Sequence, residues 1–294
     1  MKLTKKQIDT FNTQGVLIVK NALTDEDLQP IIDEISAFIY RRAHELKVAG
    51  KIRKLYENEP FEKCFGLIFE QSSEIAHGLD IMHYRGPAIF EFLHNKNLLD
   101  VVESLVGSEI TCNPIQHLRP TPPIKYYQDA ESSSHIAPLH QDAAVMMPEA
   151  EKSKITTCWL PLGDATLEMG CMEILPGIIS KGYLDHCPEG GTHIIPDLVP
   201  DVEPLPMVCY KGDVILMHRF TPHRGNLNLS ESCRWSIDLR YQPTGQHTGR
   251  TGHPAFVVRS SSNSDNVLTD HTEWCRLWMD ALENPKGVVM HRTN

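Results

Sequence analysis

The sequence lacks the features that mark several large protein classes. No apolar run approaches the ~20 residues that a membrane-spanning helix requires. The basic opening, MKLTKKQIDTFNTQG, is not followed by the apolar segment of a secretory signal peptide. The net charge of −10 argues against a nucleic-acid partner, because phosphate binding requires a basic surface. We therefore expect a protein with neither membrane nor nucleic-acid partners.

Cysteine is present, but not in the spacing of a redox or zinc motif. The eight cysteines include no C-x-x-C pair. Two of them, Cys158 and Cys209, lie within apolar runs, where a free thiol behaves as a small hydrophobic side chain. These observations predict a reduced, cytoplasmic protein.

The secondary-structure patterns predict one domain in three parts, without an internal repeat or a clear linker. Residues 1–108 are expected to be a mainly helical flank, residues 109–243 a β-barrel core, and residues 244–294 a loop and a last helix. Helices are expected after Thr4, after Thr24 and at 61–70, 86–106 and 271–283; strands are expected at 15–20, 109–118, 137–146, 155–162, 171–175, 213–219 and 233–242. Short strands with Pro- and Gly-rich connections are typical of an α+β or mainly β fold with an antiparallel jelly-roll core, here faced by N-terminal helices.

Two connections are longer than simple turns. They span residues 120–136 and 243–265. Loops of this length in a compact domain are usually functional or disordered. We expect the substrate lid to lie among them.

The stretch LHQDAAV places His140 and Asp142 two positions apart. In the predicted strand 137–146 both side chains would point to the same face, where they could bind one metal ion. In a chain with 15 histidines a His-x-Asp tripeptide also arises by chance, so the motif is weak without its context.

A third ligand must come from elsewhere in the chain. The downstream candidates are His186, His193, His218, His223, His247 and His253. The segment YKGDVILMHRFTPHRGNLN places His223 just beyond a strand that follows a Gly-Asp turn, whereas His218 suits a residue packed within the sheet. His223 is therefore the favoured ligand, with His218 as its rival.

The segment CRWSIDLRYQ, eleven residues after His223, alternates regularly. Its apolar face comprises Cys233, Trp235, Ile237, Leu239 and Tyr241, and its polar face comprises Arg234, Ser236, Asp238 and Arg240. We expect the first face to pack on helices and the second to line a cavity. Two histidines and one carboxylate form the facial triad of non-haem Fe(II) oxygenases, whose open positions accept a 2-oxo acid and O2. The planar fork of Arg234 is suited to the far carboxylate of such an acid.

With these motifs the chain resembles the phytanoyl-CoA dioxygenase (PhyH) family of Fe(II)/2-oxoglutarate-dependent oxygenases. The resemblance rests on KQIDTFNTQGVLIVKNALTDEDL, LHQDAAV, GCMEILPG and KGDVILMHRFTPHRGNLN with the following arginine, and covers most of the chain. It implies a double-stranded β-helix, or cupin-like, core. It also implies that His140, Asp142 and His223 bind iron and that Arg234 binds 2-oxoglutarate. Trp159 resembles the tryptophan beside the cosubstrate, and His117 falls where a cosubstrate contact often lies.

The chain departs from the family pattern at two places near the expected pocket. Gly225 stands where the family often has serine, and PGIISKG lacks the histidine of the usual PGSHK-like run. Neither change removes a predicted ligand, but both affect the expected contacts to the cosubstrate. Asp142 is retained, which disfavours halogenation, because related halogenases have a small residue at that position.

The resulting expectation is a dioxygenase that uses Fe(II), 2-oxoglutarate and O2 to oxidise, most simply to hydroxylate, a small metabolite or natural-product intermediate. The alternative is a metal-binding, cupin-like isomerase or binding protein, which would keep the His/Asp cluster without needing Arg234. Trp159 could equally be a core residue. The sequence does not indicate an oligomeric state or identify the substrate.

Overall fold

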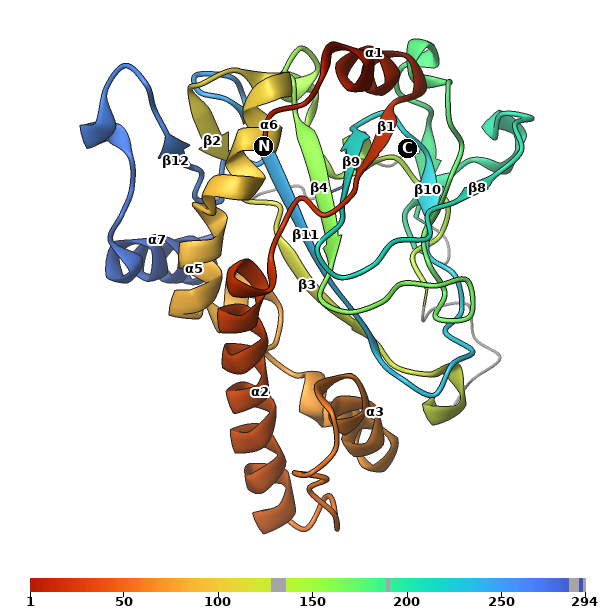
Figure 1. Cartoon of the computed structure of the whole chain (residues 1–294), viewed down its shortest axis with the longest axis vertical. Coiled ribbons are helices and arrows are strands. Elements are labelled where there is room, and N and C mark those ends of the chain that lie inside the picture. Colours follow the sequence, from red (N-terminus) through yellow and green to blue (C-terminus); the bar gives the residue numbers. More distant parts are fainter. Residues whose placement is uncertain (128–135, 189–190, 286–290, 293–294) are drawn as a thin grey trace.

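The computed structural model describes residues 1–127, 136–188, 191–285 and 291–292, and its centre is an antiparallel sheet (Figure 1). The strand order is β1-β9-β4-β11-β2-β12, and β3 pairs with the remaining part of β11. These strands are β1 (Val16–Val19), β2 (Ile110–Cys112), β3 (His117–Thr121), β4 (Thr156–Pro161), β9 (Val214–His218), β11 (Arg234–Pro243) and β12 (Phe256–Arg259). Every pairing between them is antiparallel.

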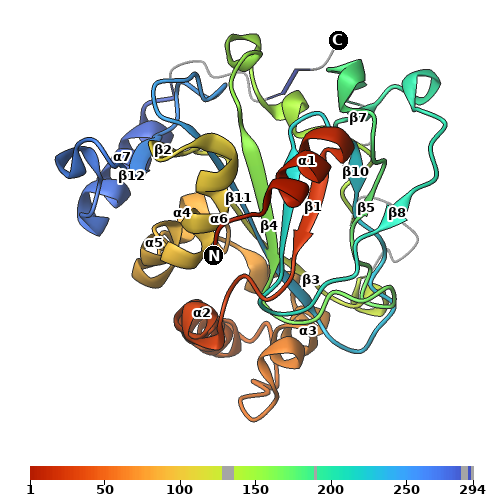
Figure 2. The same ribbon diagram turned by 45° about the horizontal axis from the view of Figure 1, so that its top comes forward.

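A second, smaller sheet lies beside the first. It consists of β10 (His223–Arg224), β5 (Glu173–Ile174) and β8 (Leu205–Pro206), again antiparallel. In Figure 2 these strands lie on the far side of β1 from α5, α6 and α7. A hairpin of β6 (His186–Cys187) and β7 (His193–Ile194) adjoins them. The cavity described below is lined from both sheets.

Helices cover the opposite face of the main sheet. They are α1 (Lys5–Gln14), α2 (Asp25–Val48), α3 (Phe61–Gln71), α4 (Ile81–Tyr84), α5 (Pro87–Leu93), α6 (Lys96–Val106) and α7 (His271–Glu283). Leu28, Ile31 and Ile35 of α2 enter one buried cluster with the apolar side chains of β11. The alternation predicted for this segment is therefore confirmed, because Trp235, Ile237, Leu239 and Tyr241 of β11, and Cys233 just before it, are all in that cluster. The combination of helices and antiparallel sheet agrees with the predicted fold class.

Capping interactions define several helix boundaries. Thr4 and Thr24 each form a capping box at the start of their helix, so both helices begin where the sequence predicts. The expected helix at 86–106 is instead two helices, α5 and α6. Asn95 separates them, because its side chain accepts a hydrogen bond from the Leu98 amide at 2.9 Å and so starts a new helix.

Two predicted strands are wrong in detail. Residues 137–146 are not a strand: His140 makes only an isolated bridge with His223, and Asp142–Val145 is a 3-10 turn. The run 109–118 is divided into β2 and β3 by Asn113, whose side chain binds Gln242 and the Thr248 carbonyl. Both interruptions arise from side-chain hydrogen bonds that compete with strand pairing.

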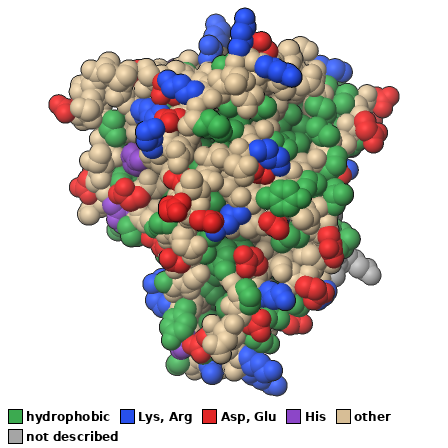
Figure 3. All heavy atoms as spheres, in the orientation of Figure 1, with side chains coloured by type: hydrophobic (Ala, Val, Ile, Leu, Met, Phe, Trp, Pro, Cys, Tyr) green, Lys and Arg blue, Asp and Glu red, His purple; other side chains and the backbone are tan. Residues whose placement is uncertain are grey.

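The surface carries charges of both signs. On the face seen in Figure 3, acidic and basic side chains are interspersed rather than gathered by sign. None of the described helices has the length and apolar character needed to cross a membrane.

Candidate active site

Three potential metal ligands, far apart in sequence, meet at one point. One ligand atom each from His140, Asp142 and His223 lies within 4.8 Å of the other two. Among the described residues this is the group of three or more such side chains that could hold a metal ion. The backbones of His140 and His223 exchange hydrogen bonds of 3.0 and 2.9 Å, which fixes the two imidazoles side by side with ring centroids 4.3 Å apart.

Both imidazoles are oriented by their own backbone. Nδ1 of His140 lies 2.7 Å from the Pro138 carbonyl, and Nδ1 of His223 lies 3.0 Å from the Thr221 carbonyl. Since a carbonyl only accepts, each Nδ1 carries the proton and each Nε2 keeps its lone pair. Burial, followed by the proximity of His223, lowers the pKa of His140 to about 3. At physiological pH His140 is therefore a neutral imidazole, which can offer its Nε2 lone pair to a metal ion.

The carboxylate of Asp142 is held at both oxygens. Thr157 donates a hydrogen bond to Oδ2, and Arg240 donates one to Oδ1. Burial alone would raise the pKa of this carboxyl, but Arg240 and the two histidines outweigh it and keep the pKa well below the usual range. The group is thus an ionised, oriented ligand.

A second set of contacts fixes the backbone between the two ligands. The Gln141 side chain donates to the Gly182 and Phe220 carbonyls at 2.9 and 2.8 Å and accepts from the Leu184 amide at 2.8 Å. The backbone N–H of Gln141 donates a hydrogen bond to Nε2 of His186 at 3.0 Å. These bonds hold the segment in a non-strand conformation that directs His140 and Asp142 to one point.

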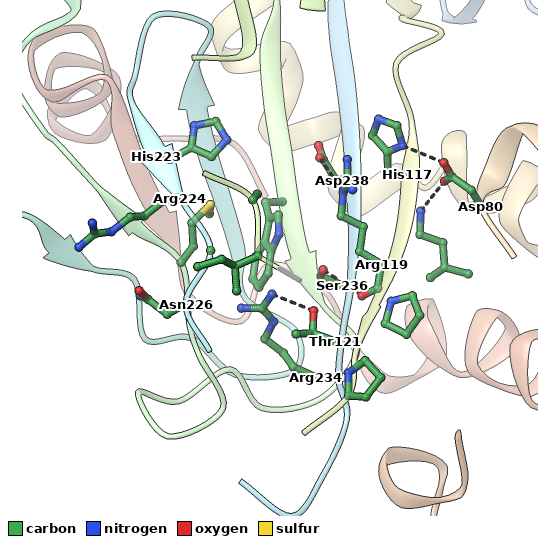
Figure 4. Close-up of a pocket in the computed structure, with 18 of the residues that line it drawn as sticks. Asp80, His117, Arg119, Thr121, His223, Arg224, Asn226, Arg234, Ser236 and Asp238 are labelled. Carbon is green, nitrogen blue, oxygen red and sulfur yellow. Dashed lines mark hydrogen bonds and ion pairs between the residues drawn. The ribbon is translucent and has the colours of Figure 1, made fainter. Parts of the chain in front are cut away.

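The three side chains open into a cavity of about 450 Å³. Its floor is the polar face of β11, whose residues form successive cross-strand rows with β3 and β4. The rows are Arg240–Thr157, then His117–Asp238–Trp159, then Arg119–Ser236–Pro161, and finally Thr121–Arg234. Directly paired side chains on one face of a sheet are neighbours, so the rows run from the triad to Arg234. Figure 4 shows Arg234 and His223 on opposite sides of this space.

Arg234 is a buried cation without an acidic partner. Its guanidinium donates to the Gly170 carbonyl and, at 3.0 Å, to Thr121 Oγ1, and its Nε has no hydrogen-bond partner. Within the described part of the chain, no carboxylate lies within ion-pair distance of it. Burial lowers the pKa of Arg234, but the group remains a cation at neutral pH. A buried charge is costly unless compensated, so this cavity is suited to a carboxylate ligand.

The two remaining predicted site residues both line the cavity. Trp159 is 6% exposed, packs in a cluster with Met172 and Met217, and lies beneath the Arg234 guanidinium at 5.7 Å from the ring centroid. It therefore combines a core position with a cavity position. His117 Nδ1 lies 3.0 Å from Asp80 Oδ2, and His117 is the cross-strand partner of Asp238, four residues along β11 from Arg234.

The rival ligand His218 lies outside the triad. Its ring packs near Phe11 and Phe220 at centroid distances of 6.4 and 5.3 Å. Thr157, Gln141 and Asp80 were not singled out from the sequence, and His186 was considered only as a possible metal ligand; their contacts cross long sequence separations. Arg240 had been placed on the cavity face by its alternation, but not beside Asp142.

A sequence profile of the Phytanoyl-CoA dioxygenase (PhyH) family matches residues 11–236. The chain belongs to this family. The predicted class, an Fe(II)/2-oxoglutarate-dependent dioxygenase, is thereby confirmed. Among curated relatives, "Phytanoyl-CoA dioxygenase domain-containing protein 1 homolog" of Dictyostelium discoideum is 24% identical over 274 residues, covering 82% of this chain and 92% of the relative.

Solved structures share the fold. The non-heme monooxygenase ThoJ, in its apo form, has a TM-score of 0.62 at 16% identity, covering 94% of this chain and 97% of that one. The epimerase SnoN, in complex with Fe3+, alpha ketoglutarate and nogalamycin RO, has a TM-score of 0.57 at 17% identity and covers 84% and 87%. At these identities the likeness concerns the fold alone.

Proposed function

We propose that the protein oxidises a small organic molecule with Fe(II), 2-oxoglutarate and O2, releasing succinate and CO2. His140, Asp142 and His223 would hold the iron, and Arg234 would bind the far carboxylate of 2-oxoglutarate. The observation that carries this proposal is the conjunction of the triad with a buried, unpaired guanidinium in the same cavity. The two antiparallel sheets on either side of the cavity support a double-stranded β-helix core. We also propose that the chain forms one domain.

The donor set fits a ferrous ion. Two neutral imidazoles and one carboxylate match the facial triad, which leaves coordination positions for a 2-oxo acid and O2. When bound, the iron would react with 2-oxoglutarate and O2 to supply the oxidant for a substrate C–H bond, with hydroxylation as the default outcome.

The residues of the chain position these groups and exclude water. Arg240 and Thr157 hold the Asp142 carboxylate in a single orientation, and Gln141 fixes the backbone on which it lies. Arg234 would form a two-point ion pair with the cosubstrate, for which its fork is suited. Trp159 would form the apolar wall beside the cosubstrate, and Asp238 and His117 lie on the other side of the floor.

The alternative function is a metal-binding isomerase or binding protein. Such a protein would have no need of a buried guanidinium without a counter-charge. Arg234 therefore favours the oxygenase. A cytoplasmic location and a small-molecule substrate remain predictions, the former compatible with eight unpaired cysteines.

An anaerobic titration tests the proposal. Adding Fe(II) and then 2-oxoglutarate to the metal-free protein should produce a weak visible charge-transfer band, because the 2-oxo acid chelates the metal. Equilibrium dialysis with radiolabelled 2-oxoglutarate should show binding that depends on the metal. Metal binding without any 2-oxoglutarate binding would support the isomerase or binding protein instead.

A further inference from the structure

A polar cluster on the cavity wall lies apart from the three proposed iron ligands and Arg234. It consists of Asp80, His117, Arg119 and Asp238, all of which line the cavity. Asp238 is four residues from Arg234 along β11, a separation of roughly 13 Å. The cluster is therefore displaced along β11 from the expected carboxylate site toward Arg240, which pairs with Asp142. Figure 4 shows Asp80, His117 and Asp238 apart from Arg234.

The internal contacts of the cluster orient its acceptors. Asp80 accepts hydrogen bonds from the amides of Ile81 and Leu118 at 2.9 and 3.1 Å, and its other oxygen lies 3.0 Å from Nδ1 of His117. Burial would raise the pKa of Asp80, but the hydrogen bonds from His117 and from the Leu118 amide lower it overall. The ionised Asp80 accepts a hydrogen bond from the N–H at Nδ1 of His117. Nε2 of His117 is therefore the atom available to a ligand.

Asp238 is the second acceptor. Its side chain is 11% exposed and lies 3.0 Å from Arg240, which also serves Asp142, and 3.9 Å from Arg119. Asp238 Oδ1 has no partner with hydrogen-bond geometry among the described residues. Arg119 is 54% exposed at its side chain, so solvent weakens its attraction for Asp238. This part of the cavity therefore presents acceptors and negative charge.

The adjacent wall is apolar. It is formed by side chains of α3, of η1 (Ser73–Ala76) and of the segments that follow β3 and η1. Its members are Phe65, Phe69, Ala76, Leu79, Pro122 and Tyr127. A molecule placed here would have an apolar body against this wall and a polar group at Asp238 and His117.

We propose, on the basis of the proposed function, that the substrate is an apolar molecule carrying a hydroxyl or ammonium group. This group donates a hydrogen bond to the Asp238 carboxylate or to Nε2 of His117, whose ring is oriented by Asp80. The contact fixes the substrate relative to the triad, so Asp238 and His117 determine specificity. A substrate with a carboxylate or phosphate at that position is disfavoured, because it would face Asp238 and Asp80.

Three probes of one skeleton test the proposal: 3-phenylpropylamine, 3-phenylpropan-1-ol and 3-phenylpropanoate. Binding to the protein loaded with Zn(II) and 2-oxoglutarate, which does not turn over, is measured by ligand-observed NMR. We expect the amine or the alcohol to bind at least about tenfold more tightly than the carboxylate, in keeping with a hydrogen bond to a charged group. A preference for the amine identifies a cationic substrate, and equal binding of amine and alcohol identifies a neutral donor.

Asp238→Asn and His117→Phe should each abolish most of this preference. The control Asp201→Asn, at an exposed position outside the cavity, should leave it unchanged. Two variants are used because Asp238 pairs with buried Arg240, and circular dichroism establishes that each one is folded. The inference is overturned if the carboxylate binds as tightly as the other probes, if no probe binds, or if folded His117→Phe keeps the preference. If the wild-type protein shows no metal-dependent binding of 2-oxoglutarate, the proposed function itself is refuted.

Discussion

Arg240 and Asp142 form an ion pair in the protein interior, with only 4% and 1% of their side chains exposed. The same guanidinium lies 3.0 Å from Asp238. Burial would lower the pKa of Arg240, but the two carboxylates raise it. One cation thus connects the carboxylate of the triad to the carboxylate on the substrate side.

Replacing Arg240 by Met should strongly destabilise the metal-free protein. The change leaves Asp142 and Asp238 buried close together without a counter-charge, and breaking such a pair costs about 3–5 kcal/mol. Urea denaturation measures the loss. The matched control Arg276→Met removes an exposed pair with Glu273 on α7 and should change the unfolding free energy far less, because solvent weakens exposed ion pairs. Equal losses in the two variants would contradict this account of Arg240.

Replacing His223 by Ala should abolish both Fe(II) binding and 2-oxoglutarate turnover. His218→Ala should retain both, because that ring packs near Phe11 and Phe220 outside the triad. Succinate formation and metal content after dialysis are the measurements. Loss of metal in His218→Ala, with His223→Ala unaffected, would reverse the assignment.

Replacing Arg234 by Met should weaken 2-oxoglutarate binding by at least about 30-fold, or roughly 2 kcal/mol, since a buried charge partner is lost. Metal affinity should not change. Because Arg234 has no acidic partner, the cosubstrate-free variant should be no less stable than the wild type. Arg224→Met is the control: it lines the same cavity but already pairs with Glu173 at 2.6 Å. A similar loss of 2-oxoglutarate affinity in both variants would refute a specific role for Arg234.

Replacing Gln141 by Leu should weaken metal binding by about 10–100-fold, the range seen when groups supporting a metal ligand are removed. The side chain makes three hydrogen bonds that hold the backbone between His140 and Asp142. Competition with a chelator measures the affinity. Gln29→Leu, on the exposed side of α2, serves as the control. Unchanged affinity in Gln141→Leu would show that the turn holds its shape without these bonds.

Acid should destabilise the metal-free protein partly through His218. Burial lowers the pKa of His218 from 6.5 to about 4, so folding favours the neutral ring. The resulting stability is complete above pH 6.5 and is lost as the pH falls toward 4. The unfolding free energy should decrease over this range, and less so in His218→Gln than in the wild type. His77→Gln, at an exposed position, should show the wild-type decrease.

Local patterns predicted much of this molecule. The alternation of β11 could be read from the sequence because the strand lies between a helical layer and a cavity, so each face has a distinct environment. The helix at 271–283 was predicted with its observed bounds, because its apolar residues recur at helical spacing. The three proposed iron ligands were also chosen from the sequence, through the strand preceding His223 and the resemblance to a family.

Contacts between distant segments could not be predicted. The conformation of residues 139–142 depends on Gln141, which binds backbone groups about 40 and 79 residues away, and on His186. The pairing of Asp80 with His117 likewise joins residues 37 apart. Such contacts leave no periodicity in the sequence, so the strand predicted at 137–146 was wrong although its two polar side chains do converge.

The ten residues of β11 also restrict how this enzyme can change. An insertion or deletion of a single residue there would exchange the two faces, turning Trp235 and Ile237 into the cavity and Arg234 and Arg240 toward the helices. New substrates must therefore be accommodated by side-chain replacement at positions such as 236 and 238, or by remodelling α3 and η1. The apolar wall is contributed by a separate layer, and its redesign leaves the iron ligands in place.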